Sequence, residues 1–244
     1  MLAIIGGRTL TSLAGLDITH REVVRTPYGE PSGPVVFGRI QGAEAMFIAR
    51  HGYGHTIAPH EVNYRANIWA LREKNATDIV SVASVGGIRA GFGPGEIVVP
   101  DQLIDYTWGR KSTYFEGGAP VTHIDFTEPY SPPLRRRILA AATACTEIVH
   151  DGGLYAATQG PRLESAGEIE RLARDGADIV GMTGMPEATL ARELGLQYAV
   201  IAVVVNHAAG RAASRSRIQL DGVEEVISRT MERVLRIIET LVRQ

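Results

Sequence analysis

The sequence predicts an α/β sandwich built on a mixed, largely parallel β-sheet, and two observations favour it. Short apolar runs rich in β-formers recur along the chain, and several are apolar on both faces, as strands in the middle of a sheet are. Segments with an amphipathic helical pattern lie between some of these runs. No repeat, low-complexity tract or domain-separating linker interrupts the 244 residues, so we expect one domain over residues 1–244.

The predicted strands are short, and the most strongly apolar of them has the sequence YAVIAVVV. Its length suits a strand and is far below the roughly 20 apolar residues that a membrane-spanning helix needs. The eight runs are Leu2–Ile5, Val35–Phe37, Ala45–Ala49, Asp78–Ala83, Glu96–Val99, Gly153–Ala157, Asp178–Val180 and Tyr198–Val205.

Three segments carry an apolar stripe at helical spacing. The first begins near Pro59 and ends near Asn75, the second follows Pro132, and the third begins near Asp221 and continues toward the C-terminus. The segment from Thr107 to Pro133 is the least regular and is rich in glycine and proline. A long irregular segment in a compact domain is usually functional or part of an interface.

Charge and composition exclude several function classes. The net charge of -2 gives no reason to expect nucleic acid or an anionic membrane as a partner. One cysteine, Cys145, excludes an intramolecular disulfide and a cluster of thiolates around zinc, and its most economical role is that of a small buried apolar residue. The N-terminal residues lack the pattern of a signal peptide. We therefore expect a soluble, cytoplasmic protein.

Three predicted strands end in residues suited to holding an anion. One runs into the glycine pair Gly6-Gly7, where backbone amides can approach an anion closely. Another ends at Arg50 and His51, and a third at Ser84, which two glycines follow shortly. A plain turn or a solvated loop explains each of them singly, but three in one sheet indicate a single phosphate site at its C-terminal edge.

Motifs of other chemistries are absent from the sequence. It has no phosphate-binding loop ending in GK[ST], no dinucleotide fingerprint, no HExxH and no GxSxG. The seven histidines are not paired with cysteine at ligand spacing, and we expect no metal site.

Six separated strings resemble the trimeric purine nucleoside and 5'-methylthioadenosine phosphorylases. They occur in the same order over essentially the whole chain from Ile4 onward, and they are IIGG, ARHG followed by HTIAPHEVNYRANIWAL, SVGG, GPRLES, GADIVGMTGMPEATLARELG and VVVNHA. The resemblance implies a single-domain, three-layer sandwich around a distorted mixed sheet, assembled as a homotrimer. It also implies a nucleoside and inorganic phosphate as co-substrates, with no metal or organic cofactor.

By this resemblance a first group of residues holds phosphate. Where the family usually has a hydroxyl residue after the first glycine pair, this chain has Arg8, with Thr9 next, so the first-loop contact departs from the pattern. The implied phosphate ligands are Arg8, Arg50, His51, Ala83, Ser84 and Thr183.

A second group is implied to hold the nucleoside. Met182 resembles the residue under the ribose, although it could simply fill the core. His123 resembles a histidine that reaches the neighbouring subunit's site, although it could be a surface residue of an irregular loop. The implied substrate-binding residues are His123, Leu163, Glu164, Met182, Asn206, His207, Ala208 and Leu220.

The base is predicted to be a 6-oxopurine. Asn206 is the expected catalytic residue, because its amide can donate to N7 and O6 of the leaving purine. The methylthioadenosine branch has two aspartates flanking one residue here, whereas this chain has Asn206, His207 and Ala208. Glu164 matches a glutamate that accepts N1–H of a 6-oxopurine. A helix N-terminal charge beside Ser165 is its alternative role.

The residues expected around the 5' position of the sugar indicate a 5'-methylthio group. Leu220 stands where ordinary purine nucleoside phosphorylases have a histidine for the 5'-hydroxyl, and the nearby Ile218 is apolar too. Together these features predict cleavage of 5'-methylthioinosine to hypoxanthine and 5-methylthioribose 1-phosphate. A methylthioadenosine phosphorylase, a general inosine/guanosine phosphorylase and a nucleoside-binding protein without activity are the alternatives.

Overall fold

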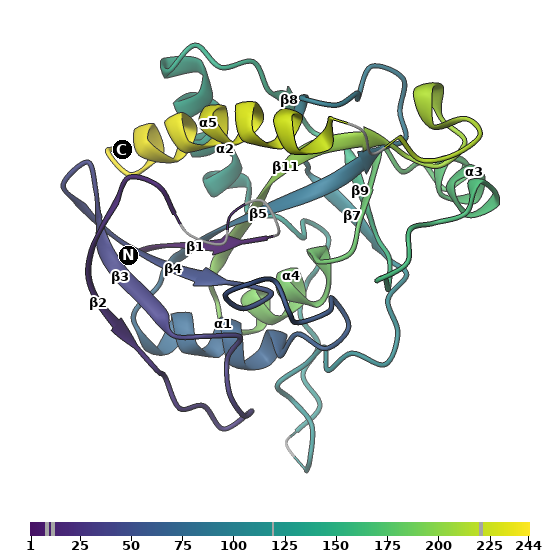
Figure 1. Cartoon of the computed structure of the whole chain (residues 1–244). Helices are drawn as coiled ribbons and strands as arrows, with labels where there is room; N and C mark the ends of the chain where they lie inside the picture. Colours follow the sequence, from purple (N-terminus) through teal and green to yellow (C-terminus); the bar gives the residue numbers. More distant parts are fainter. Residues whose placement is uncertain (8–9, 11–12, 119, 220–221) are drawn as a thin grey trace.

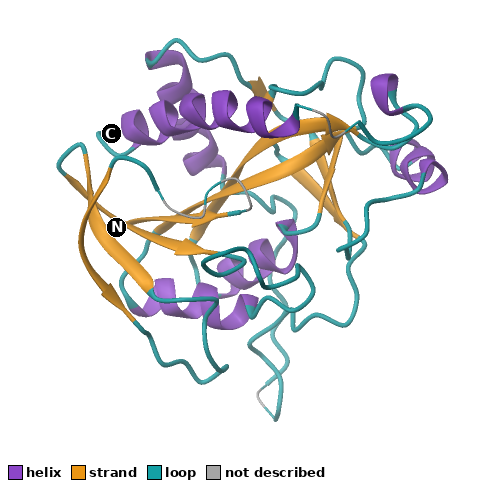
Figure 2. Cartoon of the chain, in the orientation of Figure 1, coloured by secondary structure: helices purple, strands orange, loops and turns teal. Residues whose placement is uncertain are grey.

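The computed structural model describes residues 1–244 except 8–9, 11–12, 119 and 220–221. It is an α/β sandwich in which one sheet lies between two helical layers, with both chain ends on the same side in Figures 1 and 2, so the predicted fold class is confirmed. The strands are β1 Leu2–Gly6, β2 Leu16–Glu22, β3 Val35–Ile40, β4 Ala43–Ala49, β5 Asp78–Gly87, β6 Ile97–Val99, β7 Gln102–Asp105, β8 His150–Asp151, β9 Leu154–Ala157, β10 Ile179–Gly181 and β11 Gln197–His207. The helices are α1 Tyr64–Glu73, α2 Pro132–Ala144, α3 Ala166–Arg174, α4 Gly184–Glu193 and α5 Val223–Leu241, with a 3-10 turn at Ala212–Ser214.

The described strands form one 11-stranded, branched sheet. Its main path runs β2-β3-β4-β1-β5-β10-β9-β7, and β11 joins β5 to β6, which in turn pairs with β8. β1 is parallel to β4 and β5, and β5 is parallel to β11. β3 is antiparallel to β2 and β4, and β10 is antiparallel to β5, so the sheet is mixed as expected.

Alternating residues of the central strands bury the two faces of the sheet. Ile4, Val80 and Ile201 pack in one apolar cluster with α2 and α5. Neighbouring residues Ile5 and Ile79 point the other way, into the cluster that contains α1 and α4. Figure 1 shows the same arrangement, with α5 and α2 above the sheet and α1 and α4 below it. This alternation is the period of two that a sheet buried on both faces requires.

Every predicted strand is present, but some helix and strand predictions were incomplete. α1 begins at Tyr64 rather than near Pro59, because the Asn63 side chain accepts a hydrogen bond from the amide of Ala66 and caps the helix there. β2 was missed because most of its residues are exposed, and β7 because it is short and half-exposed. α3 and α4 were missed as well, and α4 is locally non-helical at Met185 and Pro186. None of the described helices is long and apolar enough to cross a membrane.

The sheet brings the three predicted anion-binding strand ends together. β1 lies between β4 and β5, and the three are parallel, so their carboxyl ends meet at one edge. The amide of Arg50 donates to the carbonyl of Gly6 at 2.9 Å and ties the end of β4 to the end of β1. β5 pairs with β1 only as far as Ser81 but continues to Gly87. Residues 82–87 of β5, which include Ser84, therefore extend beyond the part of β5 that pairs with β1.

Candidate active site

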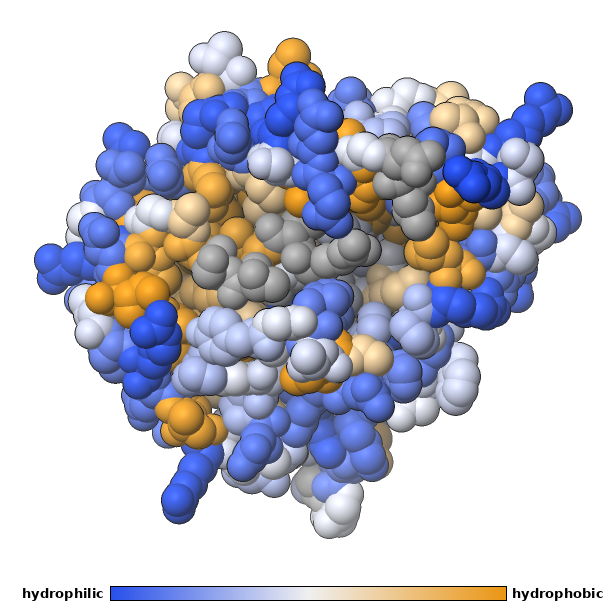
Figure 3. Space-filling view, viewed as in Figure 1, coloured by the Kyte–Doolittle hydropathy of each residue, from blue (hydrophilic) through white to orange (hydrophobic). Residues whose placement is uncertain are grey.

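A cavity of about 400 Å³ lies at this edge of the sheet. On the face that Figure 3 shows, hydrophobic residues gather to the left and right of the centre, and hydrophilic residues lie mostly toward the margins. Ten predicted site residues line the cavity: Arg50, His51, Ala83, Ser84, Leu163, Glu164, Met182, Thr183, Asn206 and Ala208.

One end of the cavity can hold an anion. Gly7 passes so close to Arg50 that a Cβ on this residue would lie 3.0 Å from Nη1 of the guanidinium and 3.0 Å from the carbonyl oxygen of Val82. A side chain at position 7 would therefore crowd the cation. Thr183, at the N-cap of α4, lines the same cavity and is 8% exposed.

Arg50 is fixed by a buried network that the sequence did not predict. Its Nε and Nη2 both donate to the carboxylate of Glu187, with Nη2 at 3.1 Å from Oε2. Nη2 also donates to Ser81 Oγ at 2.6 Å. Glu187 Oε2 in turn accepts from Ser81 Oγ at 3.0 Å and from the Tyr198 hydroxyl at 2.9 Å. Burial lowers the pKa of Arg50, but the charge and hydrogen bonds of Glu187 outweigh it and raise that pKa above its ordinary value.

Ser84 supplies a buried hydroxyl with no protein partner among the described residues. A buried polar atom without a partner is costly, and it points to a ligand when it lines a cavity. Ser84 lies inside β5 rather than after a strand that ends at Ala83, as the sequence had suggested.

His51 lines the cavity as a neutral ring. Burial and then the nearby cation of Arg50 lower the pKa of His51 to about 4. Its Nδ1 lies 2.8 Å from the carbonyl oxygen of Ile57, which only accepts, so Nδ1 carries the hydrogen. Nε2 is then an acceptor, which suits the hydroxyl group of hydrogen phosphate.

Glu164 also lines the cavity and is half-buried. Its Oε1 accepts a hydrogen bond from Thr158 Oγ1 at 2.6 Å. The alternative role as a helix N-terminal charge is filled by Glu168, which forms a capping box with Ser165 at the start of α3. Glu164 is therefore available to a ligand.

Asn206 lies at an irregularity in β11, where the register with β5 shifts between Val204 and Asn206. Its Nδ2 donates to the carbonyl of His207 at 2.7 Å, and the second hydrogen of the amide has no acceptor among the described residues. His207, in contrast, is not among the residues lining the cavity. Its ring lies beside Gly93, where a Cβ would be only 3.3 Å from it. The expected substrate contact of His207 is therefore not seen in this geometry.

Apolar side chains form the wall nearest α5. Ile218, Val223 and Ile227 line the cavity there. Met182 also lines it, and its Sδ would lie 2.4 Å from a Cβ on Gly160, so the glycine makes room for the sulfur.

Arg110 is a further residue that the sequence did not single out. Its Nη1 donates to the carbonyls of Met182 at 2.8 Å and Met185 at 2.6 Å, and its Nη2 donates to that of Gln159 at 2.9 Å. It thus joins two segments that build the cavity wall. Only contacts between distant segments could have revealed this role.

The structure does not place three further expected residues in the cavity: His123 lies outside it, and the other two are not among the described residues. His123 is exposed in the segment between β7 and α2 and does not line the cavity of its own chain. Arg8 and Leu220 lie outside the described residues. Among the described residues, no group of three His, Cys, Asp or Glu side chains could hold a metal ion.

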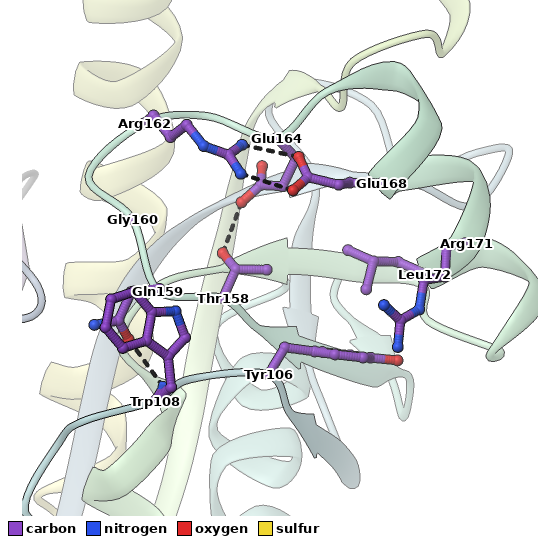
Figure 4. A pocket seen from close by; sticks show the side chains of 10 residues that line it. All are labelled: Tyr106, Trp108, Thr158, Gln159, Gly160, Arg162, Glu164, Glu168, Arg171 and Leu172. Carbon is purple, nitrogen blue, oxygen red and sulfur yellow. Dashed lines mark hydrogen bonds and ion pairs between the residues drawn. The ribbon is translucent and has the colours of Figure 1, made fainter.

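A second cavity, of about 310 Å³, adjoins the first at Glu164, which lines both. Figure 4 shows its aromatic side chains, Tyr106 and Trp108, and its charged side chains, among them Arg162 and Glu168.

Comparisons with known proteins agree with this geometry. Residues 3–243 match the family model described as the phosphorylase superfamily. A probable S-methyl-5'-thioinosine phosphorylase of Xanthomonas campestris is 55% identical over 86% of this chain and 84% of its own length. A 6-oxopurine nucleoside phosphorylase of Pyrococcus furiosus is 40% identical over 97% of this chain and 90% of its own. The methylthioadenosine phosphorylase of Schistosoma mansoni, solved with adenine, superposes with a TM-score of 0.93 at 32% identity, covering 99% of this chain and 90% of that one. With a family model spanning nearly all of its residues and relatives this similar, the chain belongs to the phosphorylase superfamily.

Proposed function

We propose that this protein cleaves 5'-methylthioinosine with inorganic phosphate, giving hypoxanthine and 5-methylthioribose 1-phosphate. The observation that carries the proposal is a single cavity lined both by Arg50 and Ser84, which could hold phosphate, and by Glu164 and Asn206, which could hold the base. The 55% identical relative named as a probable S-methyl-5'-thioinosine phosphorylase supports it.

In the reaction a phosphate oxygen forms a bond to C1' of the sugar as the bond from C1' to N9 of the purine breaks. The sugar becomes cation-like and the base leaves with the bonding electrons. The enzyme therefore needs oriented polar groups that hold phosphate beside C1' and stabilise the negative charge on the base. Arg50, Ser84 and Thr183 would hold phosphate, and His51 would accept its hydroxyl hydrogen. Asn206 would donate its free amide hydrogen to the departing base at N7 or O6.

Base selection would rest on Glu164. A carboxylate accepts the N1–H of hypoxanthine but repels the N1 lone pair of adenine. Each mispaired polar group in such a site costs about 1–3 kcal/mol, which is enough to select the base. Ala208, where the methylthioadenosine branch has an aspartate, supplies no second carboxylate for adenine.

Sugar selection would rest on the apolar wall. Ile218, Val223 and Ile227 line the cavity, and the sequence adds Leu220. A 5'-hydroxyl against such a wall would lose its hydrogen bonds to water, whereas a methylthio group would not.

We expect a homotrimer in the cytoplasm that needs no metal or organic cofactor. Its subunit contacts would include the segment between β7 and α2, in which His123, Trp108 and Val121 are exposed. Sedimentation that gives a fully active monomer at working concentration would rule out the trimer.

A panel of methylthioinosine, methylthioadenosine, inosine and adenosine, each with saturating phosphate, tests the substrate assignment. Methylthioinosine should have the highest kcat/KM, with each mismatch costing about 10- to 1000-fold, or roughly 1–4 kcal/mol. Faster cleavage of methylthioadenosine would show a methylthioadenosine phosphorylase, and faster cleavage of inosine a general 6-oxopurine enzyme. Turnover of none of the four would leave a nucleoside-binding protein.

A further inference from the structure

The carboxylate of Glu164 has one described hydrogen-bond partner, the hydroxyl of Thr158. Thr158 directly follows β9, and Figure 4 shows its hydroxyl facing Glu164. Thr158 Oγ1 lies 2.6 Å from Oε1 of that carboxylate. The two residues are six positions apart, and the turn through Gly160 brings their side chains together. This contact lies where the two cavities adjoin.

The hydroxyl hydrogen of Thr158 points to Glu164 rather than to the backbone. The other acceptor in reach is the carbonyl of Gly181, which is farther away, at 3.2 Å. That carbonyl already accepts the backbone amide hydrogen of Thr158 at 2.8 Å. A hydroxyl has a single hydrogen, and the shorter contact to a carboxylate is the stronger bond.

Among the described residues, no cation donates a hydrogen bond to Glu164, although the guanidinium of Arg162 is near enough to interact with its charge. Arg162 donates instead to both oxygens of Glu168, at 2.7 Å and 2.8 Å, as Figure 4 shows. Thr158 therefore holds Oε1 of Glu164, while Oε2 has no hydrogen bond from the described residues.

We propose that Thr158 is a specificity-determining positioning residue: by holding Oε1 of Glu164, it aims Oε2 at the N1–H of a 6-oxopurine. The proposal rests on the proposed function, in which Glu164 accepts that hydrogen. A carboxylate held at one oxygen cannot rotate away from the base, so its acceptor is in place before the nucleoside binds. Thr158 touches no reacting atom and acts through Glu164 alone.

The decisive variant is Thr158→Val, which removes the hydroxyl and keeps the shape of the side chain and the backbone bond to Gly181. We expect kcat/KM for methylthioinosine to fall about 10- to 100-fold. The kcat/KM for methylthioadenosine and the KM for phosphate should change less than about threefold, because neither adenine nor phosphate binds Glu164 as its hydrogen-bond acceptor. Thr158→Ser, which restores a hydroxyl, should recover most of the loss.

Two comparisons separate positioning from a merely structural effect. Thr143→Val makes the same change at an exposed threonine of α2 and should leave all rates unchanged. Within the described part of the chain, the Thr143 hydroxyl bonds to the carbonyl of Leu139 alone. In a Glu164→Gln background, adding Thr158→Val should cost less than about threefold. Equal losses for both bases in Thr158→Val, or no loss for either, would overturn the proposal.

The wild-type panel keeps this test distinct from that of the proposed function. If wild-type enzyme prefers methylthioinosine and Thr158→Val does not change that preference, only the role of Thr158 fails. If wild-type enzyme prefers methylthioadenosine, the base assignment itself fails, and the role of Thr158 fails with it.

Discussion

Arg50 and Glu187 form an ion pair inside the protein, with Nη2 at 3.1 Å from Oε2 and side-chain exposures of 1% and 0%. Both Nε and Nη2 of Arg50 are used in this pair, and Nη1 makes only a 3.3 Å contact with the carbonyl of Val82. The charge of Arg50 is thus balanced within the protein. Its value to an incoming phosphate lies in a fixed donor beside Gly7 rather than in excess positive charge.

Glu187→Gln should be strongly destabilising, because it leaves the buried cation of Arg50 without its counter-charge. We expect a loss of about 3–5 kcal/mol in the free energy of unfolding, measured by urea denaturation. Glu73→Gln, an exposed change in α1, should cost less than about 0.5 kcal/mol. The double variant Arg50→Met, Glu187→Gln should be more stable than Glu187→Gln alone, although inactive. If Glu187→Gln had the same free energy of unfolding as the wild-type protein, the ion pair would not contribute to stability as proposed.

Ser84→Ala should separate function from stability. The Ser84 hydroxyl has no described protein partner, so its removal should change the free energy of unfolding by less than about 0.5 kcal/mol. The kcat/KM for phosphate should nevertheless fall by about 5- to 30-fold, or roughly 1–2 kcal/mol. Initial rates at varied phosphate measure this.

Ser131→Ala is the matched control for that variant. Ser131 caps α2 by accepting from the amide of Leu134, so its loss should cost about 1 kcal/mol of stability and leave the kinetics unchanged. An unaltered phosphate dependence in Ser84→Ala would remove Ser84 from the site.

His51 should make stability depend on pH between about 4 and 6.5. The pKa of His51 is lowered from 6.5 to about 4 in the folded protein, by burial and by Arg50. Below pH 6.5, His51 therefore binds a proton in the unfolded chain but not in the folded protein. The free energy of unfolding falls as the pH drops toward 4. His51→Gln should flatten this part of the profile, measured by urea unfolding at pH 7.5, 6 and 5. The exposed control His60→Gln should leave it unchanged, and an equally steep profile in both variants would refute the assignment.

Asn206→Asp combined with Ala208→Asp should shift the enzyme toward adenine nucleosides. A carboxylate pair can hold a protonated N7 and accept from the 6-amino group, which the present amide and methyl group cannot. We expect the ratio of kcat/KM for methylthioadenosine over methylthioinosine to rise at least about tenfold. An unchanged ratio in a folded double variant would show that the residues at the end of β11 do not determine which base the enzyme accepts.

Site residues that directly follow apolar strands could be predicted from the sequence. A buried parallel strand appears there as a short apolar run, and the residue after it must lie at the edge of the sheet. Arg50 and His51 were found in this way and do line one cavity. Ser84 was found for a partly wrong reason: β5 continues past it, and Ser84 lines the cavity from the part of β5 that extends beyond its pairing with β1.

Glu187 and Thr158 could not be found in this way. Glu187 is 137 residues from Arg50 and looks like any acidic residue of a helix until α4 is packed on the sheet. Thr158 depends on the turn through Gly160, which decides that its hydroxyl meets Glu164. Helix α3 was the avoidable omission, because the capping box from Ser165 to Glu168 is a signal that the sequence itself carries.

Phosphorolysis leaves a product that hydrolysis cannot give. Methylthioinosine incubated with the enzyme and inorganic phosphate should yield hypoxanthine and 5-methylthioribose 1-phosphate in equal amounts, detected by chromatography and phosphorus NMR. Without phosphate, turnover should be negligible. Release of free 5-methylthioribose at the same rate in the absence of phosphate would make the protein a hydrolase and contradict the central proposal.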